Sequence, residues 1–378
     1  MSADRLRLLG IADGKSLNVL RWGRRLIELG HEVHIVTDKI SPEESAEAGL
    51  VMHDVRTLDA LTRVRGLRRI RIGAAIRSLA LRLDIDLTHA HYMLPYGYWA
   101  AQSGLHPLVM SPWSRDVFVD ANEKRRGRKR SLDSIRAADY VVVNSQANQR
   151  ASVELGADPS RIQEIVWYAE PGRFGPENHD TAFRPERGWP DDALVVLSLR
   201  NYRPYTHVDV LVSAFARVAP EFPKARLMLC ARAGWLREEI EQLVEELGIE
   251  HLVRMERAEY EELPRYVGSA DIAVTIADSD STPASLLEVM ASRLPVIAAP
   301  TWSIDEWLGH GEGAEIVPVR DLEATAAALR KLLADPQLRA SYGARNEQVV
   351  RSRMEEPGPV LERLYRGLIA EYHQSRAA

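Results

Sequence analysis

Short apolar runs alternate along the chain with segments in which apolar residues recur every three or four positions. The first run covers residues 6–11 and is followed by a loop of small and polar residues. Val19, Trp22 and Leu26 then recur at helical spacing, and Gly30 marks the end of that helix. Apolar strands that alternate with amphipathic helices predict a parallel sheet covered by helices on both faces.

This alternation occurs twice along the chain. The first series continues with strand-like runs at 31–37, 86–91, 107–111 and 140–145, and a second series contains runs at 194–198, 226–230, 272–276 and 295–299. The stretch between them, residues 171–190, is rich in Pro, Gly and charge and is the predicted linker. We therefore predict two doubly wound α/β domains, over 1–174 and 175–356, followed by a C-terminal helix over 357–378. Ligands of such sheets bind at the carboxyl ends of the strands, so we expect a site in a cleft between the domains.

Composition and charge narrow the class of protein. A length of 378 residues suits two domains, and a charged fraction of 27% with 23 Gly and 20 Pro excludes wholesale disorder. No apolar stretch is long enough to span a membrane and the N-terminus does not resemble a signal peptide, so we expect a cytoplasmic protein. The only cysteine, Cys230, can form neither an internal disulfide nor a metal cluster.

Charge is unevenly divided. Residues 1–175 carry a net charge of +5 and residues 176–378 a net charge of -10. Dense basic runs lie at 124–130 and, as seven arginines, between Arg63 and Arg82. These runs are either plain solvated faces or a surface for peripheral contact with an anionic membrane. Nucleic acid is not an expected partner, because no aromatic stacking platform accompanies them.

The segment 278–291 is the most informative stretch for chemistry. It follows a strand and places Pro283 at the start of a helix, where Ser281 or Thr282 could act as the cap. The amides of Ala284 and Ser285 could then hold a diphosphate, while Asp280 and Glu288 suit hydroxyl-rich ligands. Simple helix capping explains the same residues equally well.

At this point the chain resembles the retaining glycosyltransferases of family 4, which have the two-domain GT-B fold. The resemblance rests on Asp280 and Glu288 at the family's spacing of two acids, with Asp in place of the usual first Glu. It also rests on collinear segments at 18–22, 30–33, 269–272 and 287–297, in order over about 280 residues. The fold implied is α/β, with two Rossmann-like domains, an interdomain cleft and a C-terminal helix that returns to the first domain.

The resemblance implies roles for residues of the second domain. Glu288 would hold the ribose of a nucleotide donor, Asp280 would contact the transferred sugar, and Ala284 and Ser285 would cradle the diphosphate. Arg200 matches the arginine that binds donor phosphates, although a surface ion pair is the alternative. Where the family has a lysine the chain has Tyr205, so Arg203 and Lys15 are the candidate substitutes.

Residues of the first domain are expected to face the sugar and the acceptor. His89 and His91 stand at alternate positions of a strand end and point the same way. The resemblance implies that His89 contacts the transferred sugar, with His91 and Tyr92 nearer the acceptor; structural roles in the interior are the alternative. No spacing supplies further zinc ligands.

The loop after the first strand is a further candidate. Its small residues and backbone amides at a helix start suit phosphate, but Gly10-x-x-x-Gly14 is no dinucleotide fingerprint. The resemblance implies contacts from Gly14 and Lys15 to the donor and from Asn18 to the acceptor. Lys15 could equally be a solvated loop residue.

These observations lead to one predicted function and two alternatives. We expect a retaining glycosyltransferase that moves a hexose from a nucleotide-diphosphate sugar, UDP-sugar first and GDP-mannose second, to a small-molecule, glycan or lipid-linked acceptor. The resemblance implies that no metal is needed, although Asp278-x-Asp280 looks like a metal motif of another glycosyltransferase fold. The alternatives are a nucleotide-sugar 2-epimerase and a non-catalytic nucleotide-sugar-binding protein.

Overall fold

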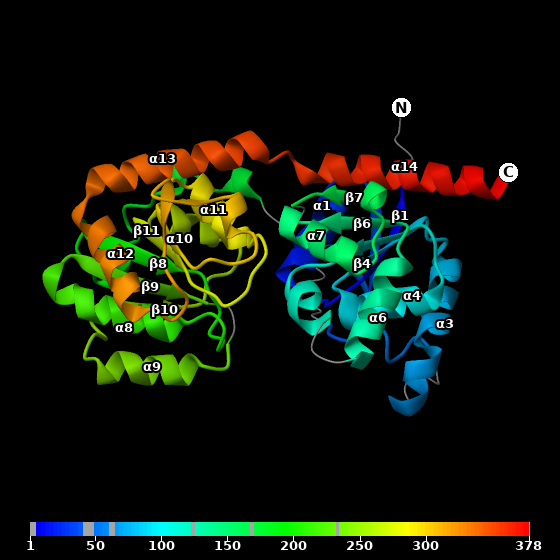
Figure 1. The fold of residues 1–378 in the computed structure, drawn as a ribbon, viewed down its shortest axis with the longest axis horizontal. Coiled ribbons are helices and arrows are strands. Elements are labelled where there is room, and N and C mark those ends of the chain that lie inside the picture. The colour runs from blue at the N-terminus through cyan, green and yellow to red at the C-terminus, as the bar shows by residue number, and fades with distance from the viewer. Residues whose placement is uncertain are drawn as a thin grey trace. The chain divides into compact units, whose positions relative to one another are not determined.

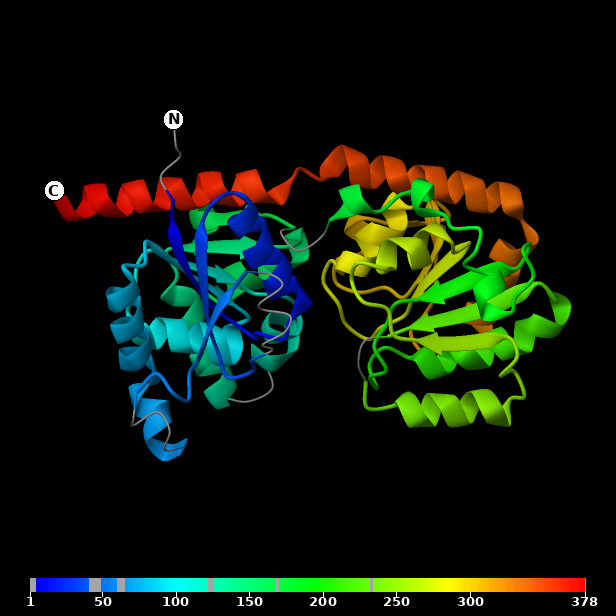
Figure 2. The same cartoon turned by 180° about the vertical axis from the view of Figure 1, so that it is seen from behind.

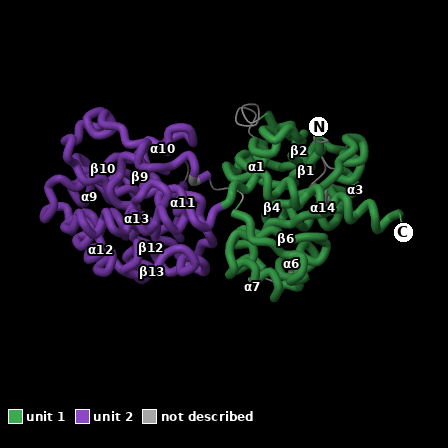
Figure 3. Tube along the Cα trace, turned by 90° about the horizontal axis from the view of Figure 1, so that it is seen from above, with its two compact units in different colours: residues 1–168, 355–378 green, residues 169–354 purple. Residues whose placement is uncertain are grey.

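A computed structural model describes residues 5–40, 49–59, 65–121, 125–166, 170–231 and 234–377. The chain divides into two compact units, which Figure 3 shows in different colours. Unit 1 comprises residues 1–168 and 355–378, and unit 2 comprises residues 169–354. The crossing at 168/169 lies among residues that the structure does not describe.

Unit 1 is built on a seven-stranded parallel sheet in the order β3-β2-β1-β4-β5-β6-β7. The strands are β1 (Arg7–Ile11), β2 (Glu32–Thr37), β3 (Val51–Asp54), β4 (Leu87–His91), β5 (Leu108–Ser111), β6 (Tyr140–Val143) and β7 (Ile162–Glu164). The helices are α1 (Leu17–Glu28), α3 (Arg65–Leu83), α4 (Tyr98–Ser103), α6 (Arg125–Arg136), α7 (Gln146–Glu154) and α14 (Pro357–Ala377).

Unit 2 repeats this plan with the order β10-β9-β8-β11-β12-β14-β13, again with every pairing parallel. Its strands are β8 (Leu194–Ser198), β9 (Ala225–Cys230), β10 (Val253–Glu256), β11 (Ile272–Thr275), β12 (Val296–Ala298), β13 (Gly309–His310) and β14 (Gly313–Ile316). Its helices are α8 (Val208–Val218), α9 (Arg237–Glu246), α10 (Leu263–Gly268), α11 (Ala284–Ala291), α12 (Leu322–Ala334) and α13 (Pro336–Arg353).

Helices cover both faces of each sheet, as the parallel arrangement requires (Figures 1 and 2). In unit 1, α3, α4 and α6 pack on one face through buried side chains such as Ile76, Ala100 and Ile135. In unit 2, α8 and α12 do the same, with Phe215 and Leu329 fully buried. Both doubly wound sheets predicted from the alternating pattern are therefore present.

The C-terminal helix α14 belongs to unit 1. Its Tyr365 is fully buried, and the Trp22 Nε1 of α1 donates a hydrogen bond of 2.9 Å to the Tyr365 hydroxyl. The chain thus returns to its first domain after completing the second. The unit boundary falls at 354/355, two residues before the one predicted from sequence.

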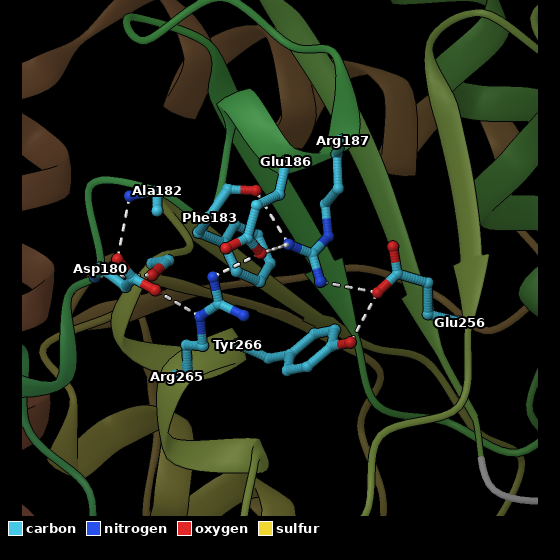
Figure 4. A network of polar contacts seen from close by, with 9 residues as sticks. Asp180, Ala182, Phe183, Glu186, Arg187, Glu256, Arg265 and Tyr266 are labelled. Carbon is cyan, nitrogen blue, oxygen red and sulfur yellow. Dashed lines mark hydrogen bonds and ion pairs between the residues drawn. The ribbon is translucent and has the colours of Figure 1, made fainter.

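The predicted linker at 171–190 is wrong, because most of this stretch is folded onto unit 2. Phe174 and Phe183 are fully buried in that unit. Figure 4 shows the polar network that secures it: Arg187 Nη2 lies 2.7 Å from Glu256 of β10, and the Tyr266 hydroxyl of α10 donates to the same carboxylate. Arg265 of α10 pairs with Asp180 and Glu186. The Pro and Gly residues of this stretch form short turns, but the phenylalanines between them are buried in unit 2.

None of the described helices is long and apolar enough to cross a membrane.

Candidate active site

Two residues of unit 2 that the sequence placed in the site meet at the carboxyl ends of two neighbouring strands. Arg200 follows β8, and Asp280 follows the adjacent β11. The Arg200 Nη1 lies 2.6 Å from the Asp280 carboxylate, and its Nε donates a 2.7 Å hydrogen bond to Thr275 Oγ1. Their side chains are 15% and 24% exposed, so the pair is largely withdrawn from water while still reaching the surface.

A small hollow lies beside this pair. Its lining includes Arg200, Thr275 and Ser285, together with apolar side chains of β8, β11 and α11, namely Leu197, Leu199, Ala273, Val274, Leu286 and Val289. A guanidinium, two hydroxyls and a helix start therefore face one space that is otherwise apolar. Such a mixture suits an anionic group attached to a larger organic ligand.

The start of α11 differs from the prediction in one respect. Pro283 is itself the N-cap residue, with φ -69° and ψ 137°, and it supplies no side-chain cap. The predicted cap by Ser281 or Thr282 is therefore wrong; the Thr282 hydroxyl instead accepts a hydrogen bond from Trp307 Nε1. Ala284 and Ser285 are the first two helical residues, whose amides have no acceptor inside a helix and point outward from its N-terminus.

Glu288 lies deeper than the other predicted donor ligands. It sits one turn into α11, and it is 1% exposed. It is not among the residues that line the hollow. Its predicted contact with ribose hydroxyls stays a prediction, since the structure places the carboxylate in the interior of unit 2.

A second side-chain contact, which the sequence did not reveal, joins the same two loops. His207 Nε2 lies 2.7 Å from Asp278, whose other oxygen lies 3.2 Å from Arg320 Nη2. The Asp278 amide also donates to the Tyr205 carbonyl. Asp278, noticed only as part of a metal-like motif, thus holds the loop that carries Arg200. His207 has a φ of 43°, a left-handed conformation that no sequence signal predicts for histidine.

Arg203 does not approach Asp280. Its guanidinium instead lies 4.2 Å from the centre of the Trp235 ring, which follows β9. The backbones of these two loops also pair, through a bridge between Tyr202 and Gly234. The role predicted for Arg203, in place of a phosphate-binding lysine, finds no direct support in this arrangement.

In unit 1 the structure places His89 in the interior. The ring is fully buried, with Nδ1 2.5 Å from the Tyr365 hydroxyl and Nε2 2.7 Å from Ser111 Oγ. Because Tyr365 accepts from Trp22, its own proton can be donated to Nδ1, which leaves Nε2–H to donate to Ser111. Burial, with the neighbouring His91, holds the pKa of His89 well below its usual value. The ring therefore joins α1, α14 and β5, and the contact with sugar predicted for it would require access that this structure does not give.

His91 and Tyr92 lie at the carboxyl end of β4 beside an aromatic residue that the sequence analysis overlooked. The two histidine rings stack at 4.1 Å, as their alternation predicts, and burial lowers the pKa of His91 to about 3. The Trp113 ring, from the loop after β5, lies 6.3 Å from His91 and 5.9 Å from Tyr92. Its place directly after a strand was the signal that could have identified it.

A buried carboxylate organises this edge of unit 1. Asp116 is fully buried and accepts hydrogen bonds from the amides of Met93, Trp113 and Ser114. Burial raises the pKa of Asp116 to about 6, although the three amides act in the opposite direction. Tyr92 donates a 2.8 Å bond to Asp120 nearby. The loops after β4 and β5 are thereby fixed relative to each other.

The loop after β1, which contains Gly14, packs closely against the end of β2 and the residues that follow it. The Gly14 amide donates to Thr37 Oγ1 at 2.9 Å, and a Cβ at this position would lie 2.7 Å from the Lys39 carbonyl oxygen. Glycine is thus required for close packing, and its amide is not directed at a phosphate as predicted. Lys15 is exposed, and Asn18 is half-buried in the first turn of α1. Both stand at the carboxyl end of β1, which neighbours β4.

No group of three or more His, Cys, Asp and Glu side chains suited to a metal ion occurs within the described residues.

Comparison with known proteins shows the class to which this architecture belongs. The family model described as "Glycosyl transferases group 1" matches residues 179–349, and that described as "Glycosyltransferase Family 4" matches residues 14–165. One match lies in each unit, and together they span most of the chain. The chain belongs to these glycosyltransferases and is an enzyme of that kind.

Particular relatives agree with this class. The chain is 28% identical to D-inositol 3-phosphate glycosyltransferase of Kineococcus radiotolerans, over 89% of this chain and 86% of the relative. In fold it resembles sucrose-phosphate synthase from Thermosynechococcus elongatus, with a TM-score of 0.80 and 20% identity over 97% of this chain and 100% of the other. It also resembles Anabaena Alr3699/HepE, crystallised with UDP and glucose, with a TM-score of 0.76 and 16% identity over 98% and 100%. The fold is accordingly GT-B.

Proposed function

We propose that the protein is a retaining glycosyltransferase that moves a hexose from a nucleotide-diphosphate sugar to an acceptor hydroxyl. The observation that carries the proposal is Arg200, which is paired with Asp280 and lines a hollow together with Ser285 at the start of α11. A cation and helix-start amides together bind a diphosphate, while a carboxylate at the same place binds sugar hydroxyls. This combination fits a sugar attached to a diphosphate better than it fits either group alone.

UDP-sugar is the donor we expect first, with a GDP-sugar such as GDP-mannose second. The Anabaena protein of the same fold was crystallised with UDP and glucose, which supports a UDP-sugar. The relative named D-inositol 3-phosphate glycosyltransferase supports a small phosphorylated acceptor as one possibility among small molecules, glycans and lipid-linked acceptors. No cofactor or metal enters the proposal.

The chemistry assigned to unit 2 is stabilisation of the leaving group. As the bond from the anomeric carbon to the diphosphate oxygen breaks, negative charge grows on that oxygen. The planar guanidinium of Arg200 and the amides of Ala284 and Ser285 are positioned to stabilise it without reorganisation. Asp280, one methylene shorter than Glu, both orients Arg200 and contacts sugar hydroxyls.

Bond formation then needs no protein nucleophile. The acceptor hydroxyl attacks the anomeric carbon from the face that the diphosphate leaves, and its proton passes to a diphosphate oxygen. The acceptor is assigned to unit 1, where Asn18, His91 and Tyr92 stand at the ends of two adjacent strands. Exposed Arg128 and Lys129 of α6 would favour an anionic acceptor or membrane surface.

The donor is identified by thermal unfolding in the presence of UDP-, GDP-, ADP- and TDP-sugars, with Glu288→Ala alongside. A ligand at 100 times its dissociation constant stabilises the fold by about 2.7 kcal/mol, which shifts the midpoint measurably. A shift with one base that disappears in the variant supports the proposal. No shift with any of the four overturns it.

Stereochemistry tests the retaining assignment once a donor and acceptor are known. Proton NMR of the product of an α-linked donor should show an α-linkage, and a β-linkage would contradict it. Turnover of the sugar without an acceptor would instead indicate an epimerase. Binding without any turnover would indicate a non-catalytic protein.

A further inference from the structure

Trp235 is the most exposed large hydrophobic side chain of the described residues, at 72%. It lies in the loop that follows β9, the strand next to β8, five positions beyond the last residue of β9. An indole held in water forgoes the free energy of burying its apolar surface. Such a residue near a binding site is a candidate for contact with a ligand.

The backbone fixes the position of this indole. Gly234 has a φ of 154°, and a Cβ there would lie 2.4 Å from the Tyr202 carbonyl oxygen. Only glycine permits this approach without strain, and it allows the bridge to Tyr202 and the hydrogen bond from the Leu236 amide to the Tyr202 carbonyl. The loops after β8 and β9 are thereby joined, and Trp235 is held at their edge.

The side chain of Arg203 supports one face of the ring. Its guanidinium lies 4.2 Å from the ring centre, an attractive cation–π contact. The exposed fraction of Trp235 leaves its remaining surface open to a planar ligand. A half-buried arginine behind a tryptophan keeps the ring in place without covering it.

The loop that carries Trp235 contacts the loop that carries Arg200. Arg200 and Arg203 belong to one loop, and their Cα atoms are at most about 11 Å apart, because three residues span no more than that. The arginine that supports the indole and the arginine assigned to the diphosphate therefore share one short loop, as contact with a single nucleotide requires. A protein partner is less well matched, because a single indole flanked by Arg203 and the exposed Arg237 offers no extended apolar core.

We propose that Trp235, supported by Arg203, is the platform on which the base of the donor nucleotide stacks. The inference rests on the proposed nucleotide-sugar function and adds a residue that determines donor affinity. It also gives Arg203 a different place from the phosphate contact predicted for it. Because stacking uses the face of any base, Trp235 contributes affinity rather than discrimination among bases.

The test compares two ligands that differ by the nucleoside. Isothermal titration calorimetry measures UDP and inorganic pyrophosphate binding to the full chain and to Trp235→Ala, Trp235→Phe and Leu247→Ala. We expect Trp235→Ala to weaken UDP binding about 5- to 150-fold, the range of base–aromatic stacking, and to leave pyrophosphate binding unchanged. Trp235→Phe should retain most of the UDP affinity. Leu247, another exposed apolar residue of unit 2, is the matched control and should have no effect.

The outcomes separate this inference from the proposed function. UDP affinity within twofold of wild type in Trp235→Ala overturns the platform, as does an equal loss for both ligands, which would indicate a collapsed loop. If that variant loses transfer activity but keeps UDP affinity, Trp235 serves the acceptor and the platform is also overturned. If Arg200→Ala abolishes UDP binding while Trp235→Ala does not, the donor site stands and only the platform fails. If wild type binds none of UDP, GDP, ADP and TDP, both proposals fail.

Discussion

Arg200 is held by two partners that leave little freedom in the direction of its guanidinium. Asp280 holds one terminal nitrogen at 2.6 Å and Thr275 accepts from Nε at 2.7 Å. Lysine at this position would keep the charge but could not make both contacts, since it lacks the planar fork. The contribution of the positive charge at position 200 can therefore be separated by experiment from the contribution of the fixed direction of the guanidinium.

We predict that Arg200→Lys lowers kcat/KM by about 10²- to 10³-fold, the effect of removing one well-placed transition-state donor. Thr275→Val, which removes only the supporting hydroxyl, should lower it by roughly fivefold, as for one net hydrogen bond. Steady-state kinetics with a saturating acceptor measures both variants, and thermal unfolding checks that each is folded. Equal effects of the two variants would contradict the role given to the guanidinium.

At this scale the sequence could nominate candidate site residues but could not predict how they contact one another. The sequence alone shows the spacing between Asp280 and Glu288. It also places Arg200 directly after a predicted strand. Their ion pair joins positions 80 residues apart, and it depends on β8 and β11 becoming neighbours. His207 could not be found, because its left-handed backbone and its pairing with Asp278 follow only from the assembled loops.

At the scale of elements, a line of buried polar groups joins α14 to the sheet of unit 1. Trp22 of α1 donates to Tyr365 of α14, and Tyr365 bonds His89 of β4, which in turn bonds Ser111 of β5. Each of these buried groups forms a hydrogen bond with the next. Loss of the Tyr365 hydroxyl would therefore remove the hydrogen-bond partner of both Trp22 and His89 in a region closed to water. The C-terminal helix is thus anchored by specific bonds as well as by apolar contacts.

We predict that Tyr365→Phe lowers the free energy of unfolding by about 1–3 kcal/mol, because it removes the shared hydroxyl and leaves the ring volume unchanged. Tyr372→Phe, near the end of the same helix, is the control and should have little effect. Urea unfolding monitored by circular dichroism measures both. A Tyr365→Phe variant as stable as wild type would show that α14 is held by apolar packing alone.

The histidines of β4 give unit 1 a dependence on pH. Burial keeps His91 neutral with a pKa of about 3, whereas the unfolded chain takes up a proton near pH 6.5. The unfolded state therefore binds more protons between these values, and the free energy of unfolding falls as the pH falls, by up to about 1.4 kcal/mol per pH unit for each such group.

We predict that His91→Phe weakens this dependence between pH 7 and pH 5, whatever it does to stability at pH 7. His373→Phe, at an exposed position of α14, should keep the wild-type slope. Urea midpoints at pH 5, 6 and 7 provide the comparison. The same slope in wild type and His91→Phe would show that the ring is protonated inside the folded unit.

Elements were the best-predicted level of the structure. The apolar runs around 194–198 and 272–276 correspond to β8 and β11, because a strand buried on both faces must be apolar throughout. The wrong prediction of a linker at residues 171–190 has a physical reason as well. Composition there favours turns, but two phenylalanines and the ion pairs of Arg187 and Arg265 hold the turns against unit 2.

At the scale of the whole molecule, two units of the same architecture present different side chains at the carboxyl ends of their strands. Unit 2 holds the paired Arg200 and Asp280 beside the start of α11, and unit 1 gathers aromatic and polar groups at the ends of β4 and β5. The repeated pattern of strands and helices predicted the two domains, whereas the donor role of unit 2 and the acceptor role of unit 1 follow from the family resemblance and stay predictions.

The most direct test of the account is hydrogen–deuterium exchange of the full chain with and without UDP. We predict slower amide exchange at residues 199–207 and 278–288 of unit 2, because these loops hold the diphosphate, and a loss of that protection in Arg200→Ala. Protection confined to unit 1, or none at a UDP concentration that saturates binding by calorimetry, would contradict the assignment of the donor to the Arg200–Asp280 site.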